Sequence, residues 1–132
     1  MHANHFTTCI WGQSRHAMLI QLLKSKIHRA TVTSANLNYQ GSISIDPKLC
    51  ALAGIVQWEH VEIYNVTNGA RLCTYVIFGN EGEITLNGAA ARCVQPGDKI
   101  IIATYAMFDQ AEAQAHQPTV ILVDDQNKPL SD

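Results

Sequence analysis

The sequence lacks the features that mark membrane-spanning, nucleic-acid-binding and disulfide-bonded proteins. No apolar run approaches the roughly 18 residues that a membrane-spanning helix needs. The net charge is -2 and no basic stripe stands out, so we expect neither a membrane nor a nucleic acid as partner. The 4 cysteines show no CxxC spacing and no short metal-like pairing, and no basic stretch leads into an apolar one at the start. We therefore expect free thiols, no metal site and a cytoplasmic location.

The sequence has enough apolar residues for one buried core. Its 132 residues are 47% hydrophobic and 15% charged, which suits one folded domain and excludes disorder for most of the chain. Residues 1–17 are polar and irregular, whereas an apolar stretch opens at Met18. We expect a flexible N-terminal extension over residues 1–17, a domain over 18–125 and a polar, loose tail over 126–132. His2 and His5 could bind a metal, but we read them as part of the flexible extension.

Short runs rich in β-branched or alternating apolar residues predict a mainly β fold. The expected strands are 26–33, 42–46, 60–66, 70–79, 82–88, 98–108 and 119–125. Asn68-Gly69 predicts a type I′ hairpin turn. One short helix is expected over Pro47–Ala53, between an Asp46 N-cap and Gly54, and another over residues 88–94. Many short strands with few, short helices favour a small closed β-barrel.

Gly41-Ser42 is either a turn or a bond that reacts, and taken alone the dipeptide is best read as a turn. Four stretches change that interpretation: SKIHR (25–29), YQGSISID (39–46), IYNVTNGARLCTY (63–75) and LNGAAARC (86–93). In this order and at these spacings they resemble the pyruvoyl-dependent aspartate 1-decarboxylases. The resemblance extends over roughly residues 18–123.

The resemblance implies a double-psi β-barrel that assembles as a homotetramer. It implies an enzyme that converts L-aspartate to β-alanine and CO2 for pantothenate and coenzyme A biosynthesis. The chain would be a zymogen that cuts itself between Gly41 and Ser42, through attack of the serine hydroxyl on the preceding carbonyl. Glycine leaves that carbonyl open to attack, and Ser42 becomes the pyruvoyl group. Its ketone would form a Schiff base with the substrate amine and accept electrons as CO2 leaves.

The other site residues follow from the same resemblance, position by position. Arg71 matches the arginine that holds a substrate carboxylate, and Lys26 matches a second cation. Tyr75 matches the proton donor to the carbanion. Thr74 matches a threonine that contacts substrate and assists cleavage by donating to the Gly41 carbonyl. Thr74 and Tyr75 face opposite sides of a regular strand, so we expect a local distortion. The substrate-closing loop is matched by Asn87, Gly88, Ala89 and Ala90.

These residues also have plain structural interpretations. Arg71 would then be a solvated hairpin residue, Lys26 a surface lysine and Tyr75 a core aromatic. Some positions depart from the family pattern, namely Asn38, Gln40, Tyr64 and Arg92. The departures leave the nucleophile, the cation and the acid in place, but Asn38 and Gln40 put the efficiency of cleavage in doubt.

Three functions stay open on the sequence. The chain is the self-processing aspartate decarboxylase, a pyruvoyl decarboxylase of another amino acid, or an unprocessed β-barrel that binds a small ligand or a partner. Lys26 and Arg71 offer two cations for the two carboxylates of aspartate. A neutral amino acid would leave one cation unpaired, at a cost on the order of 1–3 kcal/mol. We therefore favour aspartate. Whether cleavage needs an accessory maturation protein is also left open.

Overall fold

A computed structural model describes residues 18–130 of the chain. The expected N-terminal extension, residues 1–17, lies outside the described residues, as do residues 131–132. The chain forms two compact units. The smaller one includes the described residues 18–22 and 106–116, and the larger one includes residues 23–105 and 117–130. All the predicted site residues belong to the larger unit.

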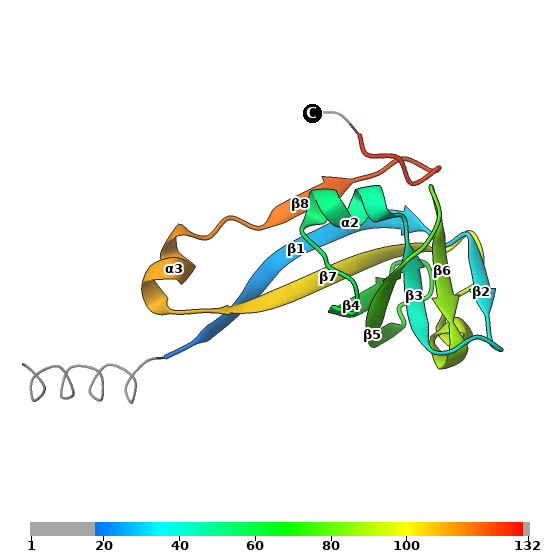
Figure 1. The fold of residues 1–132 in the computed structure, drawn as a ribbon, viewed down its shortest axis with the longest axis horizontal. Coiled ribbons are helices and arrows are strands. Elements are labelled where there is room, and N and C mark those ends of the chain that lie inside the picture. The colour runs from blue at the N-terminus through cyan, green and yellow to red at the C-terminus, as the bar shows by residue number, and fades with distance from the viewer. Residues whose placement is uncertain (1–17, 131–132) are drawn as a thin grey trace, which may run out of the picture. The chain divides into compact units, whose positions relative to one another are not determined.

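The fold is mainly β, as the sequence predicts (Figure 1). The strands are β1 (Ile20–Thr31), β2 (Ser34–Asn36), β3 (Ser42–Ile45), β4 (His60–Asn65), β5 (Arg71–Phe78), β6 (Ile84–Asn87), β7 (Lys99–Phe108) and β8 (Thr119–Leu122). They form one sheet in the order β2-β6-β3-β5-β4-β7-β1-β8. Within the described residues no ladder joins the edge strands β2 and β8. The strand pairing therefore describes an open sheet. It does not show the closed barrel that we expected from the sequence.

Two of the three short helices in the described residues begin at a capping aspartate side chain. Helix α2 (Pro47–Ala53) has the expected bounds, with the Asp46 side chain accepting a hydrogen bond from the Lys48 amide at 2.8 Å and Gly54 left-handed at φ 71°. The helix expected over residues 88–94 is a 3-10 helix, η1 (Gly88–Cys93). Strand β2 and helix α3 (Gln110–Ala115) were not predicted from the sequence. A capping box of Asp109 and Glu112 starts α3, and this D-x-x-E pattern was readable in advance.

The connection between β4 and β5 differs from the type I′ turn that we expected. A type I′ turn needs positive φ at both central residues, but only Gly69 is left-handed, at φ 82°. The Asn65 side chain accepts hydrogen bonds from the amides of Thr67 and Asn68 at 2.9 and 3.2 Å. This side-chain capture of backbone donors builds a longer, Asx-stabilised loop in place of the tight turn.

The core lies inside the larger unit and is built from the branched residues of its strands. The largest fully buried side chains include Ile27, Ile43, Ile45, Leu49, Ile63, Ile84, Leu86, Ile100 and Ile102. Burying each of them contributes on the order of 1.5–3 kcal/mol. Strand β3 lies between β5, which runs parallel to it, and β6, which runs antiparallel. This placement fixes the surroundings of Ser42, the first residue of β3.

The segment that we expected to be a loose tail is tied to the core at Asn127. This residue is 1% exposed and left-handed at φ 61°. Its side chain accepts from the Thr31 amide at 2.7 Å and donates to the carbonyls of Thr31 and Gly82 at 2.9 and 3.0 Å. At this residue three hydrogen bonds to a buried side-chain amide hold the chain in place.

No helix in the described part of the chain is long and apolar enough to cross a membrane.

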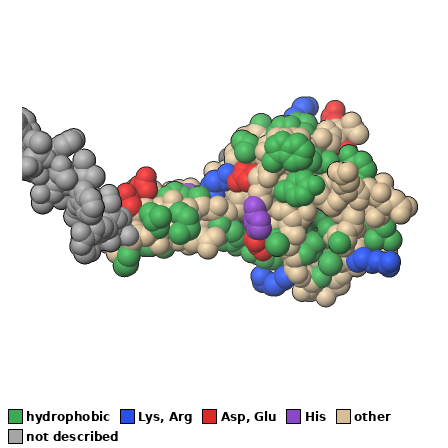
Figure 2. Space-filling model, turned by 60° about the horizontal axis from the view of Figure 1, so that its bottom comes forward, with side chains coloured by type: hydrophobic (Ala, Val, Ile, Leu, Met, Phe, Trp, Pro, Cys, Tyr) green, Lys and Arg blue, Asp and Glu red, His purple; other side chains and the backbone are tan. Residues whose placement is uncertain are grey.

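Several large hydrophobic side chains are exposed on the larger unit, and Figure 2 shows hydrophobic side chains gathered on one of its faces. The exposed set in this unit includes Leu37, Tyr39, Leu52, Val56, Trp58, Val66, Phe78, Tyr105, Val120 and Leu122.

Candidate functional site

Ser42 lies at the start of β3 and is almost fully buried, at 1% exposed. Its register partner on the antiparallel strand β6 is Asn87. The Asn87 side chain donates to Ser42 Oγ at 2.9 Å and to Ser44 Oγ at 3.1 Å. Ser42 Oγ is also 3.4 Å from the carbonyl oxygen of Gln40, to which it donates. A buried serine hydroxyl is thus held in place by a side-chain amide, directly after the glycine of the predicted cleavage bond.

Gly88 packs against the backbone that precedes Ser42. Its φ is 64°, and a Cβ at this position would lie 2.7 Å from Gly41 Cα, 2.8 Å from Gly41 N and 3.0 Å from the Tyr39 carbonyl oxygen. Only glycine fits here, because both the backbone angle and the space exclude a side chain. At Gly41 itself a Cβ would meet only the Asn87 carbonyl oxygen, at 4.0 Å. The close approach therefore depends on Gly88.

A small pocket opens beside Gly41. Its volume is about 320 Å³. The residues that line it are Gly41, Leu72, Cys73, Thr74, Tyr75, Ala89, Ala90 and Cys93. The structure thus brings together five of the predicted site residues in one pocket, next to the predicted cleavage bond. Its size suits a small metabolite better than a polymer.

Strand β5 is regular where we expected a distortion. Its register against β4 runs without a break, with Val61 opposite Thr74 and His60 opposite Tyr75. Because Val61 is fully buried and successive side chains alternate, Thr74 lies on the core-facing side. Tyr75 lies on the outer side, where its ring centroid is 5.9 Å from that of Trp58. The expected distortion is absent: the two side chains leave opposite faces of β5, and both residues nevertheless line the Gly41 pocket.

Arg71 lies on the same outer face as Tyr75 and is exposed. Its guanidinium lies over the Tyr64 ring, 4.3 Å from the centroid, in a cation–π arrangement. The Tyr64 hydroxyl shares a 2.8 Å hydrogen bond with the Tyr105 hydroxyl. That hydrogen bond is the main reason why the pKa of Tyr64 rises to about 12, so the ring stays neutral beneath the cation. No carboxylate among the described residues forms an ion pair with Arg71.

Lys26 lies apart from the pocket. It belongs to β1, where it pairs with Val120 of β8, and strands β4 and β7 separate β1 from β5 in the sheet order. The structure of one chain therefore does not bring the two predicted cations, Lys26 and Arg71, to the Gly41 pocket.

His28 lies on the same strand as Lys26. Its pKa is lowered by burial first and then by the charges of Lys26 and Arg29.

Three residues around this site were not predicted from the sequence. Ser44 shares the Asn87 amide with Ser42, and the alternation in SISI was the signal that could have placed both serines on one face. Cys73 and Cys93 line the Gly41 pocket, although they are far apart in sequence. No local pattern could have joined these two cysteines, because sheet pairing and the turn of η1 bring them together.

The chain is similar to known proteins over most of its length. Residues 18–130 match the family described as Aspartate decarboxylase. A protein from Heliobacterium modesticaldum named "Aspartate 1-decarboxylase" is 59% identical over 111 residues, which are 83% of this chain and 84% of the relative. Proteins of the same name from Bdellovibrio bacteriovorus and Clostridium kluyveri are 57% and 55% identical, over 84% and 83% of this chain and 90% and 88% of their own lengths.

Proposed function

Because the chain belongs to the aspartate decarboxylase family, we propose that it converts L-aspartate to β-alanine and CO2 in the cytoplasm. β-Alanine made in this way supplies pantothenate and coenzyme A biosynthesis. The observation that carries the proposal is the buried Ser42 hydroxyl, held at 2.9 Å by the Asn87 amide beside a pocket that reaches Gly41.

Self-cleavage between Gly41 and Ser42 is the first step that we propose. Ser42 Oγ attacks the Gly41 carbonyl carbon, and the amide becomes an ester. Thr74 lines the same pocket as Gly41, so its hydroxyl is the candidate donor to the carbonyl oxygen as negative charge develops. Gly88 allows the backbone of its loop to approach Gly41. Elimination and hydrolysis then release the chain ending at Gly41 and leave a pyruvoyl group derived from Ser42.

The residues around Ser42 fit such a group. The Asn87 amide already donates to an oxygen on this residue, and a ketone oxygen accepts the same kind of hydrogen bond. When present, the group supplies the electron sink that amino-acid decarboxylation needs. Asn87 would orient it, and the backbone at Gly88, Ala89 and Ala90 would close over the substrate. Tyr75, which also lines the pocket, is the proposed proton donor to the substrate carbon that loses CO2.

We further propose that the chain is a double-psi β-barrel and acts as a homotetramer. Barrel closure is supported by Asn127, which links Thr31 at the end of β1 with Gly82 before β6. Assembly is supported by the exposed hydrophobic side chains (Figure 2), since large apolar patches on a soluble protein commonly mark interfaces. Arg71 lies outward and Lys26 lies away from the pocket, so a neighbouring copy would have to supply the cations for the two substrate carboxylates.

The first test is the intact mass of the purified protein under denaturing conditions. We expect two fragments, one ending at Gly41 and one beginning at position 42. The second should be lighter than its serine-ended form by one ammonia, which is the signature of the pyruvoyl group. The same preparation should release CO2 and β-alanine from L-aspartate and leave neutral amino acids unchanged. A single uncleaved chain after long warm incubation, alone and with a maturation factor, would instead favour an unprocessed binding barrel.

Arg71→Ala is expected to weaken substrate binding. Loss of a charge-assisted contact to a carboxylate costs about 1.5–3 kcal/mol, so kcat/KM for L-aspartate should fall by about 10- to 150-fold. Self-cleavage should continue, because Arg71 is not part of the Gly41 pocket. Steady-state kinetics on the fully processed variant measures the effect.

Lys128→Ala is the matched control. Lys128 is an exposed cation, and its ion pair with Glu81 at 3.7 Å lies outside the pocket. Its replacement should leave kcat/KM unchanged. Equal kcat/KM values for the Arg71 variant and the wild type would show that Arg71 does not bind the substrate.

A further inference from the structure

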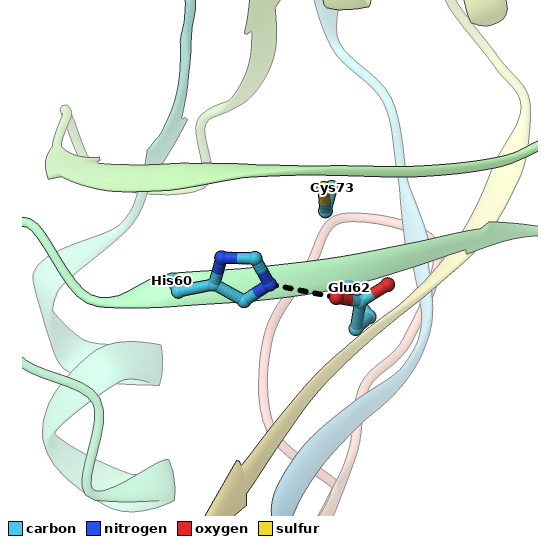
Figure 3. Close-up of side chains that lie close together, drawn as sticks. All are labelled: His60, Glu62 and Cys73. Carbon is cyan, nitrogen blue, oxygen red and sulfur yellow. Dashed lines mark hydrogen bonds and ion pairs between the residues drawn. The ribbon is translucent and has the colours of Figure 1, made fainter.

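Three side chains with metal-binding atoms converge on the outer face of the β4–β5 hairpin: His60, Glu62 and Cys73 (Figure 3). His60 and Glu62 are two residues apart on β4, so they share a face of the strand. Cys73 of β5 is the register partner of Glu62. Their ligand atoms all lie within 4.8 Å of one another, and His60 Nε2 is 2.7 Å from Glu62 Oε2.

The proposed function makes no use of this cluster. His60 and Glu62 do not line the Gly41 pocket, and Cys73 is shared between the pocket and the cluster. We expected no metal site from the sequence because the cysteines have no paired spacing. The cluster escapes such a search because its ligands come from two strands and are of three chemical types.

The types of ligand atom in the cluster indicate which metal ion it would bind. An imidazole nitrogen, a thiolate and one carboxylate suit Zn²⁺, whereas Mg²⁺ and Ca²⁺ prefer sites made of oxygen ligands. Zinc sites with three protein ligands keep a fourth position for water or another ligand. The His60 side chain is 67% exposed and that of Glu62 is 36% exposed, so the open side of the cluster can supply that position.

The geometry needs only small movements. Zinc–ligand distances of about 2.0–2.3 Å place the ligand atoms of a tetrahedral site roughly 3.5 Å apart. The present spread of up to 4.8 Å closes to this value by side-chain rotation, and exposed side chains on regular strands rotate freely. Zn²⁺ bound at His60 Nε2 would replace the hydrogen bond between His60 and Glu62, and the Cys73 thiol would release its proton to water.

We propose that His60, Glu62 and Cys73 bind one Zn²⁺ ion on the outer face of the β4–β5 hairpin. The proposed site lies next to two aromatic residues. Tyr75 is the register partner of His60, and the Trp58 ring lies 5.9 Å from the Tyr75 ring. With one carboxylate and one thiolate as ligands, the zinc site has no net charge, so a bound ion would cancel the negative charge of Glu62 beside the outer face of β5.

The test is a titration of metal-free, full-length protein with Zn²⁺, measured by isothermal titration calorimetry. We expect one Zn²⁺ per chain, and at least about a tenfold loss of affinity in His60→Ala and in Cys73→Ser, since each removes a ligand. Cys93→Ser is the matched control, because Cys93 is a free thiol near Cys73 that lies outside the cluster. Its affinity should equal that of the wild type. The thermal unfolding of all metal-free variants checks that they fold.

A second measurement identifies the ligand sulfur. Titration with Co²⁺ should produce a thiolate-to-cobalt charge-transfer band in the wild type and in Cys93→Ser but not in Cys73→Ser. Unchanged zinc affinity in both His60→Ala and Cys73→Ser would overturn the proposal and move any bound metal elsewhere, for instance to His2 and His5. Absence of binding to the wild type would overturn it as well. Neither readout depends on self-cleavage or on decarboxylation, so the result stands apart from the proposed function.

Discussion

Ser42→Ala is expected to leave the chain in one piece and to abolish decarboxylation. Without Oγ no nucleophile reaches the Gly41 carbonyl, and alanine cannot become a ketone. The fold should survive, because the Asn87 amide keeps its other acceptor, Ser44 Oγ at 3.1 Å, and so is not left unpaired. Intact mass should show one full-length chain, and β-alanine formation should fall to background.

Ser34→Ala is the matched control for this variant. Ser34 also carries a partly buried hydroxyl, hydrogen-bonded to Thr85 Oγ1 at 2.7 Å, and it lies on β2, outside the Gly41 pocket. The Ser34→Ala variant should cleave itself and convert L-aspartate to β-alanine like the wild type. Two fragments or measurable β-alanine from the Ser42 variant would disprove the assignment of the nucleophile.

Gly88→Ala is expected to cost the protein a large part of its stability. A left-handed alanine costs on the order of 1–3 kcal/mol, and the clash of its Cβ with the Gly41 backbone at 2.7 Å adds about 1–3 kcal/mol. The total cost of about 2–6 kcal/mol is a large fraction of the roughly 5–15 kcal/mol that stabilises an ordinary domain. Urea unfolding should be measured in the Ser42→Ala background, so that every chain is uncleaved. In the wild-type background, displacement of Gly41 should also slow self-cleavage.

Gly54→Ala separates the two causes. Gly54 is left-handed at φ 71°, close to the 64° of Gly88, but a Cβ there would meet nothing within 4 Å. This control should show only the cost of the backbone angle. If both variants lose the same free energy of unfolding at equal protein concentration, the close approach of Gly88 to Gly41 does not matter for stability.

Local signals in the sequence determined the elements that short-range energetics control. Helix α2 begins and ends as expected because the Asp46 cap, Pro47 and Gly54 act within one turn of the chain. The mainly β class followed from the alternation and the β-branched runs. Where a local rule failed, a competing local contact was the reason: the Asn65 side chain took the backbone donors of the turn that Asn68-Gly69 was expected to form.

The similarity of the chain to a family, readable from four stretches, pointed to Gly41, Ser42, Thr74, Tyr75 and the loop at Asn87. It could not say how these residues meet. The expected distortion of β5 is absent, because its register against β4 is regular. Arg71 and Lys26, which the resemblance joined at one substrate, lie on separate parts of a single chain.

The sequence by itself therefore determined the mainly β class of the fold and the bounds of helix α2, whereas cleavage between Gly41 and Ser42 stays a prediction. Only the tertiary structure decided that Asn87 holds Ser42, that Gly88 must be glycine and that His60, Glu62 and Cys73 converge. The physical reason is the distance along the chain over which each interaction acts. Caps and alternation act between residues close in the chain, whereas the Ser42–Asn87 hydrogen bond joins residues 45 positions apart. Such a contact exists only after β3 and β6 pair in one register, which the packing of the whole core selects.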